Sequence, residues 1–185
     1  MRWCVLLVKG SERVDEEQLV ERAITGDRHC LNILFQMHYK SVYGYLIKLS
    51  GDVHLAEDLV QETLLKATMN IEKFRGDSKF LTYLIQIATN LYRNEVRKQS
   101  RIVYDDEVIQ SLSTHGEQDA LTKLQFKEAM NALQEMSEEQ RVSFLLKHYY
   151  GYSIEEVSNL FGVPTGTTKS RIYQVVQNIR KKLKG

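Results

Sequence analysis

The sequence predicts an all-helical protein made of two small helical domains joined by a flexible acidic linker. The chain has 185 residues and a single proline, and no valine- or isoleucine-rich run alternates as a half-buried strand would. Several segments instead repeat apolar residues at the helical spacing i, i+3, i+4 and i+7. This periodicity fades after Arg101 in an acidic stretch with glycine and serine, and it returns near Leu121. The two periodic parts therefore indicate two helical domains.

The expected domain limits follow from these changes in pattern. They are an N-terminal tail (1–10), a first domain (11–100), the linker (101–119) and a second domain (120–185). Helical domains of this size bury limited apolar area and often rely on a partner. We therefore expect each domain to work in contact with another molecule.

Capping and stop signals divide the first domain into helices. A short helix begins near Val14 and is stopped by Gly26. Asp27 is a candidate N-cap for a longer helix that ends at Gly51, and Asp52 is the candidate cap of a third helix. The third helix places its apolar residues on one face, which consists of Ala56, Leu59, Val60, Thr63, Leu64 and Ala67. Its other face is acidic and polar, with Glu57, Asp58, Gln61 and Glu62.

A fourth helix follows the turn at Asp77-Ser78 and ends in a basic cluster. Its apolar stripe consists of Leu81, Leu84, Ile85, Ala88, Leu91 and Tyr92. Its polar end carries Asn90 and four cations, which are Arg93, Arg97, Lys98 and Arg101. The helix dipole favours cations near a helix C-terminus, which accounts for Lys98 and Arg101 better than for Asn90. Asparagine is a poor helix former, and its amide can pair with the edge of a base.

The second domain contains a helix-turn-helix pattern between Tyr152 and Leu183. Two candidate N-caps have glutamine or glutamate three positions later, in the pairs Ser137–Gln140 and Ser153–Glu156. Gly162 supplies a turn residue that tolerates positive φ, and Pro164 and Thr165 begin the last helix. The apolar stripe of that helix consists of Ile172, Val175, Val176, Ile179 and Leu183.

The last helix leaves polar residues largely on its outer side. These residues are Thr168, Lys169, Ser170, Tyr173, Gln174 and Gln177. They are of the types that meet phosphates and base edges when a recognition helix lies in the major groove, and the helix N-terminus itself favours a nearby phosphate. An ordinary helical hairpin with a polar face is the alternative. We favour DNA binding because the turn, the polar first turns and a tail without Asp or Glu coincide.

Charge is segregated along the chain, although its net value is only +1. Segment 157–185 contains no Asp or Glu, and its cations are Lys169, Arg171, Arg180, Lys181, Lys182 and Lys184. Segment 104–119 contains no Lys or Arg. A basic patch attracts phosphates whatever the total charge is, whereas a solvated helix face and a solvated loop are the ordinary alternative.

No feature of the sequence indicates catalysis, a metal or a cofactor. The two cysteines, Cys4 and Cys30, belong to no CxxC pair, and the five histidines show no metal-ligand spacing. Neither a phosphate-cradling glycine loop nor a nucleophile–base motif is present. We therefore expect no enzyme activity, no metal site and no cofactor.

No apolar run approaches the length needed to span a bilayer. The apolar stretch Trp3–Val8 is short for a signal peptide and lacks a small-residue cleavage site. We therefore expect a cytoplasmic protein that does not itself insert into a membrane.

Three blocks resemble the extracytoplasmic-function (ECF, group IV) sigma factors of bacterial RNA polymerase, in the sigma-70 family. AEDLVQETLLKA (56–67) is similar to the family's polymerase-binding segment. FRGDSKFLTYLIQIATN (74–90) resembles the segment that engages the −10 element, and VPTGTTKSRIYQ (163–174) resembles the −35 recognition helix. Their order and spacing match the family over nearly the whole chain. A generic helix-turn-helix protein has no reason to carry the first two blocks.

The resemblance implies a promoter-specificity subunit without catalytic activity of its own. Its partners would be core RNA polymerase, through the β′ clamp helices and the β flap, and promoter DNA in double- and single-stranded form. The residues implied for polymerase binding are Glu57, Asp58, Gln61 and Glu62. Those implied for the −10 strand are Asn90, at a pocket for a flipped base, and the cations Arg93, Arg97, Lys98 and Arg101. Those implied for the −35 duplex are Thr168, Lys169, Ser170, Arg171, Tyr173 and Gln174.

The resemblance also implies an anti-sigma partner that covers these surfaces and can hold the factor at the membrane. The acidic linker resembles the family's connector, which passes near the active cleft of the polymerase. Three positions depart from the family: Tyr83 stands where Trp is frequent, and Gln86 and Gln174 stand where Arg is frequent. The family's arginine contact is therefore absent at those two glutamines.

One alternative function stays open on the sequence alone. A two-domain repressor or activator would use only the helix-turn-helix, and its first domain would bind a ligand or dimerise. Such a protein would bind promoter duplex by itself, whereas sigma factors of this type bind promoters poorly without polymerase.

Overall fold

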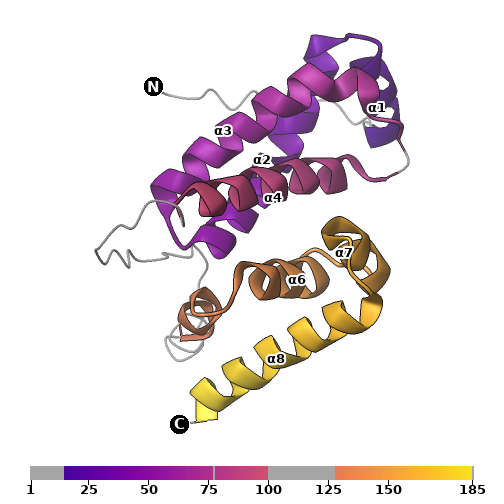
Figure 1. Ribbon diagram of the computed structural model, residues 1–185. Helices are drawn as coiled ribbons and strands as arrows, with labels where there is room; N and C mark the ends of the chain where they lie inside the picture. Colours follow the sequence, from indigo (N-terminus) through magenta and orange to yellow (C-terminus); the bar gives the residue numbers. More distant parts are fainter. Residues whose placement is uncertain (1–14, 77, 100–127, 185) are drawn as a thin grey trace.

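The computed structural model describes residues 15–76, 78–99 and 128–184, and within these ranges it contains helices and no strand (Figure 1). The predicted all-helical class is therefore confirmed for this part of the chain. The N-terminal tail, the acidic linker and the predicted DNA contact Arg101 lie outside the described residues.

The helices fall into two units along the chain. The first helical unit, within residues 15–99, contains α1 (Glu16–Ile24), α2 (Arg28–Ser50), α3 (Val53–Asn70), the 3-10 turn η1 (Ile71–Lys73) and α4 (Phe80–Gln99). The second helical unit, residues 128–184, begins with a helical stretch at 128–134. It continues with α6 (Glu138–Tyr149), α7 (Ile154–Phe161) and α8 (Thr165–Lys184).

Side-chain caps begin several of these helices where the sequence predicts them. Asp52 accepts two backbone N–H hydrogen bonds at the start of α3, at 2.8 and 3.1 Å. Both predicted capping boxes form, at Ser137 and Ser153. Each cap satisfies backbone donors that a first helical turn otherwise leaves without a partner. The predicted stop Gly51 and the predicted turn residue Gly162 have φ of 73° and 63°, left-handed values that suit glycine.

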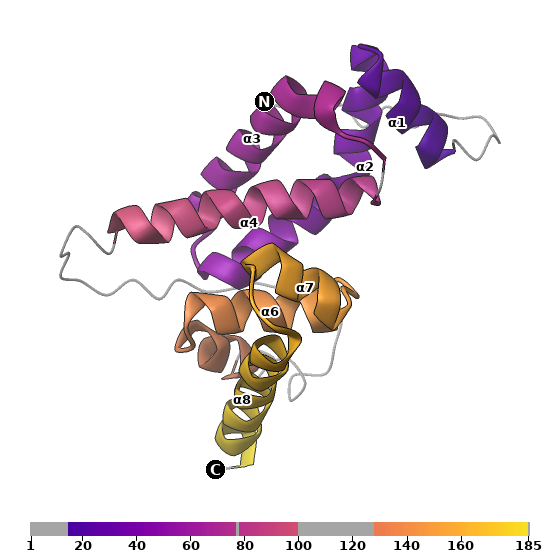
Figure 2. The same ribbon diagram turned by 45° about the vertical axis from the view of Figure 1, so that its right-hand side comes forward.

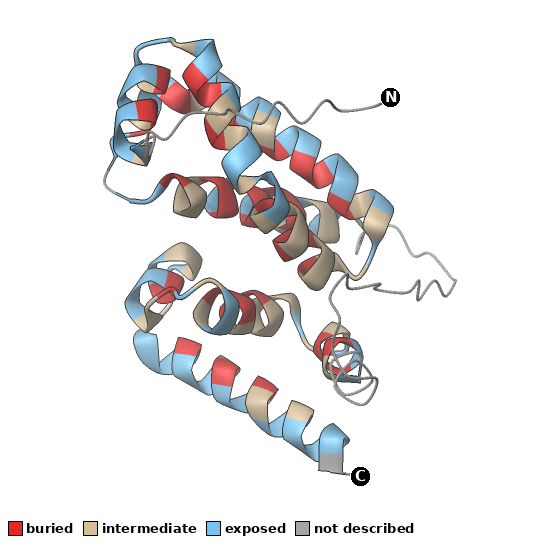
Figure 3. Ribbon diagram, turned by 180° about the vertical axis from the view of Figure 1, so that it is seen from behind, coloured by how far each residue is buried: buried red, intermediate tan, exposed pale blue. Residues whose placement is uncertain are grey.

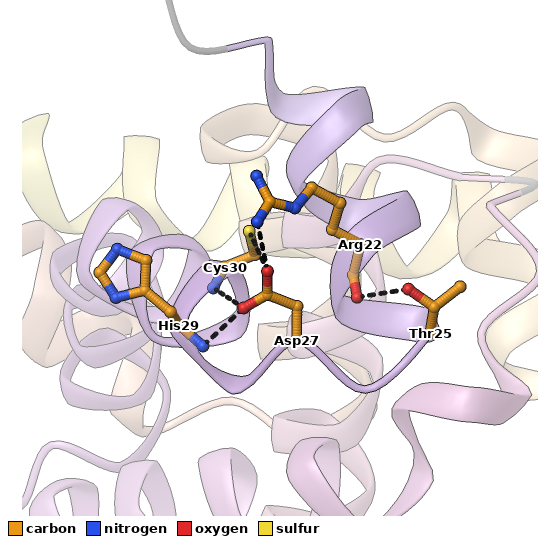
Figure 4. A network of polar contacts seen from close by, with 5 residues as sticks. All are labelled: Arg22, Thr25, Asp27, His29 and Cys30. Atoms are coloured by element: carbon orange, nitrogen blue, oxygen red, sulfur yellow. Dashed lines mark hydrogen bonds and ion pairs between the residues drawn. The ribbon is translucent and has the colours of Figure 1, made fainter.

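Asp27 joins α1 to α2 through both of its carboxylate oxygens (Figure 4). Oδ1 accepts hydrogen bonds from the backbone N–H groups of His29 and Cys30, at 2.9 and 3.1 Å. Oδ2 accepts from Arg22 Nη2 at 2.6 Å and from the Cys30 thiol at 3.3 Å. These bonds, the backbone bond from Cys30 first, lower the pKa of Asp27 to about 2. Burial and the nearby carboxylate raise the pKa of the Cys30 thiol, which makes it a structural thiol and a poor nucleophile.

The core of the first unit lies between α2, α3 and α4, as the buried positions in Figure 3 indicate. Five positions of the predicted inner stripe of α3 are buried, Ala56, Leu59, Val60, Thr63 and Ala67, and the sixth, Leu64, is half-buried. Tyr45 of α2 is fully buried, and its hydroxyl lies 2.7 Å from the hydroxyl of Thr89 on α4. The Thr89 hydroxyl donates to the carbonyl of Ile85 at 2.7 Å, so Tyr45 is the donor to Thr89. Both buried hydroxyls thus avoid the cost of an unpaired polar group.

The second unit is the predicted helix-turn-helix, α7 and α8, packed on α6. Val157 of α7 and Val175 of α8 are fully buried at the contact between the two helices. The prediction that Leu183 belongs to the buried stripe of α8 is wrong, because its side chain is 42% exposed. The last turns of α8 extend away from α6 and α7 (Figure 2), and Lys182 there forms an ion pair with Glu135, directly after the helical stretch 128–134.

The two units pack against each other and share one core. Tyr150, directly after α6, places its ring 5.2 Å from the ring of Tyr45 and donates to the Ser41 carbonyl at 3.1 Å. Tyr152 donates to the Thr82 carbonyl at 3.3 Å. Burial raises the pKa of Tyr150, and it raises the pKa of Tyr152 to about 12. Both hydroxyls therefore stay protonated and act as hydrogen-bond donors. These contacts place α4 of the first unit alongside α6 and α7 of the second unit (Figure 2).

Replacing Asp27 by asparagine should weaken the fold more at neutral pH than in acid. Asparagine keeps the N-cap acceptor but removes the charge. Because the pKa of Asp27 is depressed from 3.8 to about 2, its contribution is complete above the ordinary value and is lost as the pH falls toward about 2. Chemical denaturation at about pH 7 and about pH 3 measures the gap in free energy of unfolding between wild type and Asp27→Asn. We expect a smaller gap at the lower pH, and an equal gap would contradict the assignment.

Candidate nucleic-acid interface

The exposed face of α3 carries the four side chains predicted to meet the polymerase. Glu57, Asp58, Gln61 and Glu62 are all exposed. Glu62 Oε1 lies 3.3 Å from Lys66 Nζ one turn later, and both side chains are about half exposed. Solvent screens such an i,i+4 pair, so it contributes little to stability. The face is therefore acidic and open to a partner.

Two apolar side chains extend this acidic face, and the sequence reasoning missed them. Leu65 is 60% exposed and Met69 is 73% exposed. Leu65 follows Asp58 by seven positions and Gln61 by four, so it shares their face of the helix. Exposed apolar side chains beside charged ones are typical of a protein-binding surface. The same helical spacing, read on the outer face, would have identified them.

Asn90 and Arg97 lie on one outward face of α4. Both are exposed, and a separation of seven residues corresponds to about two turns of helix. Asn94 is also exposed and lies between them. It belongs to the same face, and the sequence reasoning missed it. Lys98 lies to one side, with Nζ 3.4 Å from Oε2 of Glu95.

Arg93 lies in the contact between the two units, away from that outward face. Its side chain is only 20% exposed, and its Nε is 2.9 Å from Oε1 of Glu138. Its guanidinium carbon is 5.0 Å from the centre of the Phe161 ring. Burial raises the pKa of Glu138, and the charge of Arg93 opposes that increase. In this arrangement Arg93 is occupied by the second unit and does not face an open surface.

The first turns of α8 present polar side chains to solvent. Lys169, Ser170 and Tyr173 are exposed, Tyr173 by 64%. Gln174 is also exposed, and its Oε1 accepts a hydrogen bond from Gln140 Nε2 at 2.7 Å. An amide–amide bond therefore stands where the sigma factors that the sequence resembles often have an arginine.

The expectation that Thr168 lies on the outer side of the last helix is wrong, because Thr168 is fully buried. It precedes Ile172 by four positions, so the two share the inner face of α8. Its hydroxyl lies 2.7 Å from the hydroxyl of Ser158 on α7. Ser158 already donates its hydrogen to the Ile154 carbonyl at 2.6 Å, so Thr168 is the donor in the pair. Thr168 therefore fixes α8 against α7 and does not offer its hydroxyl to DNA.

Arg171 is only partly exposed. Its guanidinium carbon lies 5.2 Å from the centre of the same Phe161 ring that Arg93 approaches. Its Nη1 is buried and has no hydrogen-bond partner among the residues that the structure describes. A buried donor without an acceptor costs free energy. The Arg171 side chain therefore contacts the Phe161 ring but leaves one of its N–H groups without a hydrogen bond.

Within residues 15–76, 78–99 and 128–184, no group of three or more His, Cys, Asp and Glu residues is arranged to hold a metal ion. Over the same ranges, every helix is too short or too polar to cross a membrane. The polar surfaces of α3, α4 and α8 are thus the candidate sites of this chain.

Both units match known sigma-70 regions. Residues 34–102 match Sigma-70 region 2, and residues 126–179 match Sigma-70, region 4. The chain is 30% identical over 180 residues to an RNA polymerase sigma-H factor of Pseudomonas aeruginosa, with 91% of this chain and 93% of the relative covered. It is 35% identical over 132 residues to the ECF RNA polymerase sigma factor EcfG of Rhodopseudomonas palustris, with 71% and 73% covered.

The fold is similar to that of a solved sigma factor. The sigma factor RpoE from Bartonella quintana, solved in complex with the anti-sigma factor NepR, superposes with a TM-score of 0.70. The two are 26% identical, and the match covers 83% of this chain and 96% of that chain. These matches confirm the family that the three sequence blocks indicate. The chain belongs to the ECF sigma factors of the sigma-70 family, the non-catalytic subunits through which RNA polymerase recognises promoters.

Proposed function

We propose that this sigma factor binds core polymerase through α3 and divides promoter recognition between α4 and α8. In this proposal α8 reads the −35 duplex, and α4 holds the non-template strand of the −10 element. The helix-turn-helix carries the proposal: the bond between Ser158 and Thr168 fixes its inner face, and the polar residues at the start of α8 are exposed.

Lys169, Ser170 and Tyr173 are the proposed readers of the −35 element. They occupy the N-terminal half of α8, and a recognition helix contacts base edges mainly through its N-terminal residues. Lysine meets phosphates or guanine, and serine meets phosphates or any base edge. Arg180 and Lys181, exposed toward the other end of α8, add positive potential that attracts the DNA backbone.

Asn90, Asn94 and Arg97 are the proposed contacts to the −10 strand. An asparagine amide can bond a base edge with two hydrogen bonds, and an arginine suits a phosphate. Capturing a flipped base costs a few kcal/mol of unstacking, and contacts along one helix face can offset that cost. Lys98, one turn beyond Asn94, adds a further cation near the strand.

The outer face of α3 suits the proposed contact with the β′ clamp helices. Exposed Leu65 and Met69 provide an apolar centre, and Glu57, Asp58 and Glu62 provide a charged rim. Interfaces of this composition bind through the apolar centre and choose partners through the rim. The family resemblance adds the β flap as a contact of the second unit.

We also propose an anti-sigma partner. The support is that a sigma factor 26% identical to this chain was solved in complex with one. Such a partner would cover the acidic face of α3 and the polar start of α8. A membrane-anchored partner would hold the factor at the membrane, and release would return it to polymerase in the cytoplasm.

Transcription in vitro tests the proposed function as a whole. The protein is mixed with sigma-free bacterial core polymerase and genomic promoter fragments, and the 5′ ends of the RNA are sequenced. We expect discrete start sites that share −35 and −10 elements. A strong footprint by the protein alone, without transcripts when core polymerase is added, would favour a stand-alone regulator.

Reversing one charge on the α3 face should weaken binding to core polymerase. Asp58→Lys reverses the sign of a charge on the rim of the proposed interface, and we expect the affinity to fall about tenfold to a hundredfold. Glu21→Lys, which makes the same change at an exposed position on α1, is the matched control. Titration of labelled protein with core polymerase measures both. Equal affinity of Asp58→Lys and wild type would remove α3 from the interface.

Replacing Lys169 by alanine should weaken the binding of the holoenzyme to promoter DNA. We expect roughly a threefold to tenfold loss and a decrease of about one in the slope of log affinity against log salt, because one phosphate contact disappears. Arg180→Ala removes an equal charge near the other end of α8 and should change binding less. Titrations at several salt concentrations measure both slopes, and identical behaviour of the two variants would count against Lys169 as a contact.

A further inference from the structure

Gln174 of α8 is joined to Gln140 of α6 by a hydrogen bond between their side-chain amides. Nε2 of Gln140 donates to Oε1 of Gln174 at 2.7 Å. Gln174 follows Ser170 by one turn of helix and follows Tyr173 directly, and all three side chains are exposed. Gln174 therefore belongs to the outer face of α8 that carries the proposed readers of the −35 element.

The capping box at the start of α6 fixes the orientation of the Gln140 amide. The backbone N–H of Ser137 donates to Oε1 of Gln140 at 3.1 Å, and the backbone N–H of Gln140 donates to Oγ of Ser137 at 3.4 Å. A backbone N–H is only a donor, so the side-chain atom of Gln140 that faces it is the amide oxygen. The NH2 group of Gln140 therefore points to Gln174.

The orientation of the Gln174 amide follows from that of Gln140. An amide NH2 group can only donate, so Gln174 meets it with its own oxygen, Oε1. Nε2 of Gln174 has no hydrogen-bond partner among the residues that the structure describes. Two hydrogen bonds thus connect the backbone of Ser137 to Gln174, and they leave a free donor on the outer face of α8.

A glutamine held in this way presents a different pattern to DNA from a free glutamine. A free glutamine pairs with adenine through two hydrogen bonds, because its NH2 group donates to N7 and its oxygen accepts from N6. In Gln174 that oxygen is already occupied by Gln140, so only donors remain. In the major groove, guanine presents the acceptors N7 and O6 and thymine presents O4, whereas N6 of adenine and N4 of cytosine are donors.

We propose that Gln174 is a further base-specificity residue of α8 and that Gln140 positions it as a hydrogen-bond donor, so that it favours guanine or thymine over adenine or cytosine. The inference rests on the proposed reading of the −35 duplex by α8. Arginine, which is frequent at this position in the sigma factors that the sequence resembles, also has only donors. The bond to Gln140 gives Gln174 the same donor character without the positive charge.

A selection from promoter DNA with a randomised −35 element tests the role of Gln174. Holoenzyme assembled from the full chain and sigma-free core polymerase is used to enrich bound promoters, which are then sequenced. In Gln174→Ala the preference for guanine or thymine should disappear at one base pair and persist at the others. We expect discrimination there to fall roughly threefold to tenfold, the effect of about one hydrogen bond. Unchanged preferences at every base pair would overturn the role of Gln174.

Gln140→Glu tests the positioning, because it should reverse the polarity of Gln174. Glutamate also forms a capping box with serine, so α6 keeps its cap. A carboxylate only accepts, so Gln174 turns its NH2 group toward it and leaves Oε1 free. We expect the preference at the same base pair to change to adenine or cytosine by roughly threefold to tenfold. A retained preference for guanine or thymine would overturn the positioning by Gln140.

Two further variants separate polarity from charge and from folding. Gln140→Met removes the amide contact, which frees Gln174 to rotate, and adenine should then be accepted at that base pair. Gln18→Glu makes the same charge change as Gln140→Glu at an exposed position on α1, and it should keep the wild-type preferences. The added charge of Gln140→Glu weakens binding to all sequences alike and does not by itself change a base preference. Circular dichroism verifies that each variant is folded.

A failure of the proposed function would give a different result from a failure of this inference. Wild-type holoenzyme would then enrich no shared −35 element, and both would be overturned. A shared element in the wild type, together with unchanged preferences in Gln174→Ala or Gln140→Glu, would overturn this inference alone.

Discussion

The rest of the structure depends on the packing of Tyr45, which contacts α4 and the second unit at once. Its side chain is fully buried on α2, and its hydroxyl meets Thr89 on α4. Its ring meets the Tyr150 ring of the second unit edge to face, at 5.2 Å and 85°. One side chain therefore joins the packing inside the first unit to the boundary between the units. Burying an aromatic side chain of this kind contributes about 1.5–3 kcal/mol, and losing it would loosen both contacts.

A buried threonine precedes the proposed DNA contacts on both α4 and α8. Thr89 bonds to Tyr45 and to its own helix, which turns Asn90 outward. Thr168 bonds to Ser158, which turns Lys169 and Ser170 outward. In each helix the hydroxyl is satisfied inside the core, so the inner face is fixed by a directional bond as well as by apolar packing. The position of the polar face relative to the core follows from these two bonds.

Features that depend on neighbours a few residues apart could be predicted from the sequence. The cap at Asp27 and the positive φ of the turn residue Gly162 follow from such local rules and are confirmed. The meeting of Arg93 and Arg171 could not be predicted, because it depends on how two distant segments dock. Thr168 differs from both. Its four-residue spacing from Ile172 indicates the inner face of the helix, but its polar side chain led to the prediction that it is exposed to solvent. Thr168 is buried because its hydroxyl bonds to the Ser158 hydroxyl on α7, and the residue type of Thr168 alone does not reveal such a partner.

The boundary between the units combines contacts that hold it closed with others that leave it incomplete. Tyr152 is buried and Tyr150 is half-buried, and both donate to backbone carbonyls. Arg171, by contrast, leaves Nη1 unpaired, and burial disfavours the charged form of Glu138. Burying a charged or polar group costs free energy unless its partners compensate for that cost. The boundary between the units therefore combines tyrosine hydroxyls whose hydrogen bonds are made with charged groups whose burial is only partly compensated.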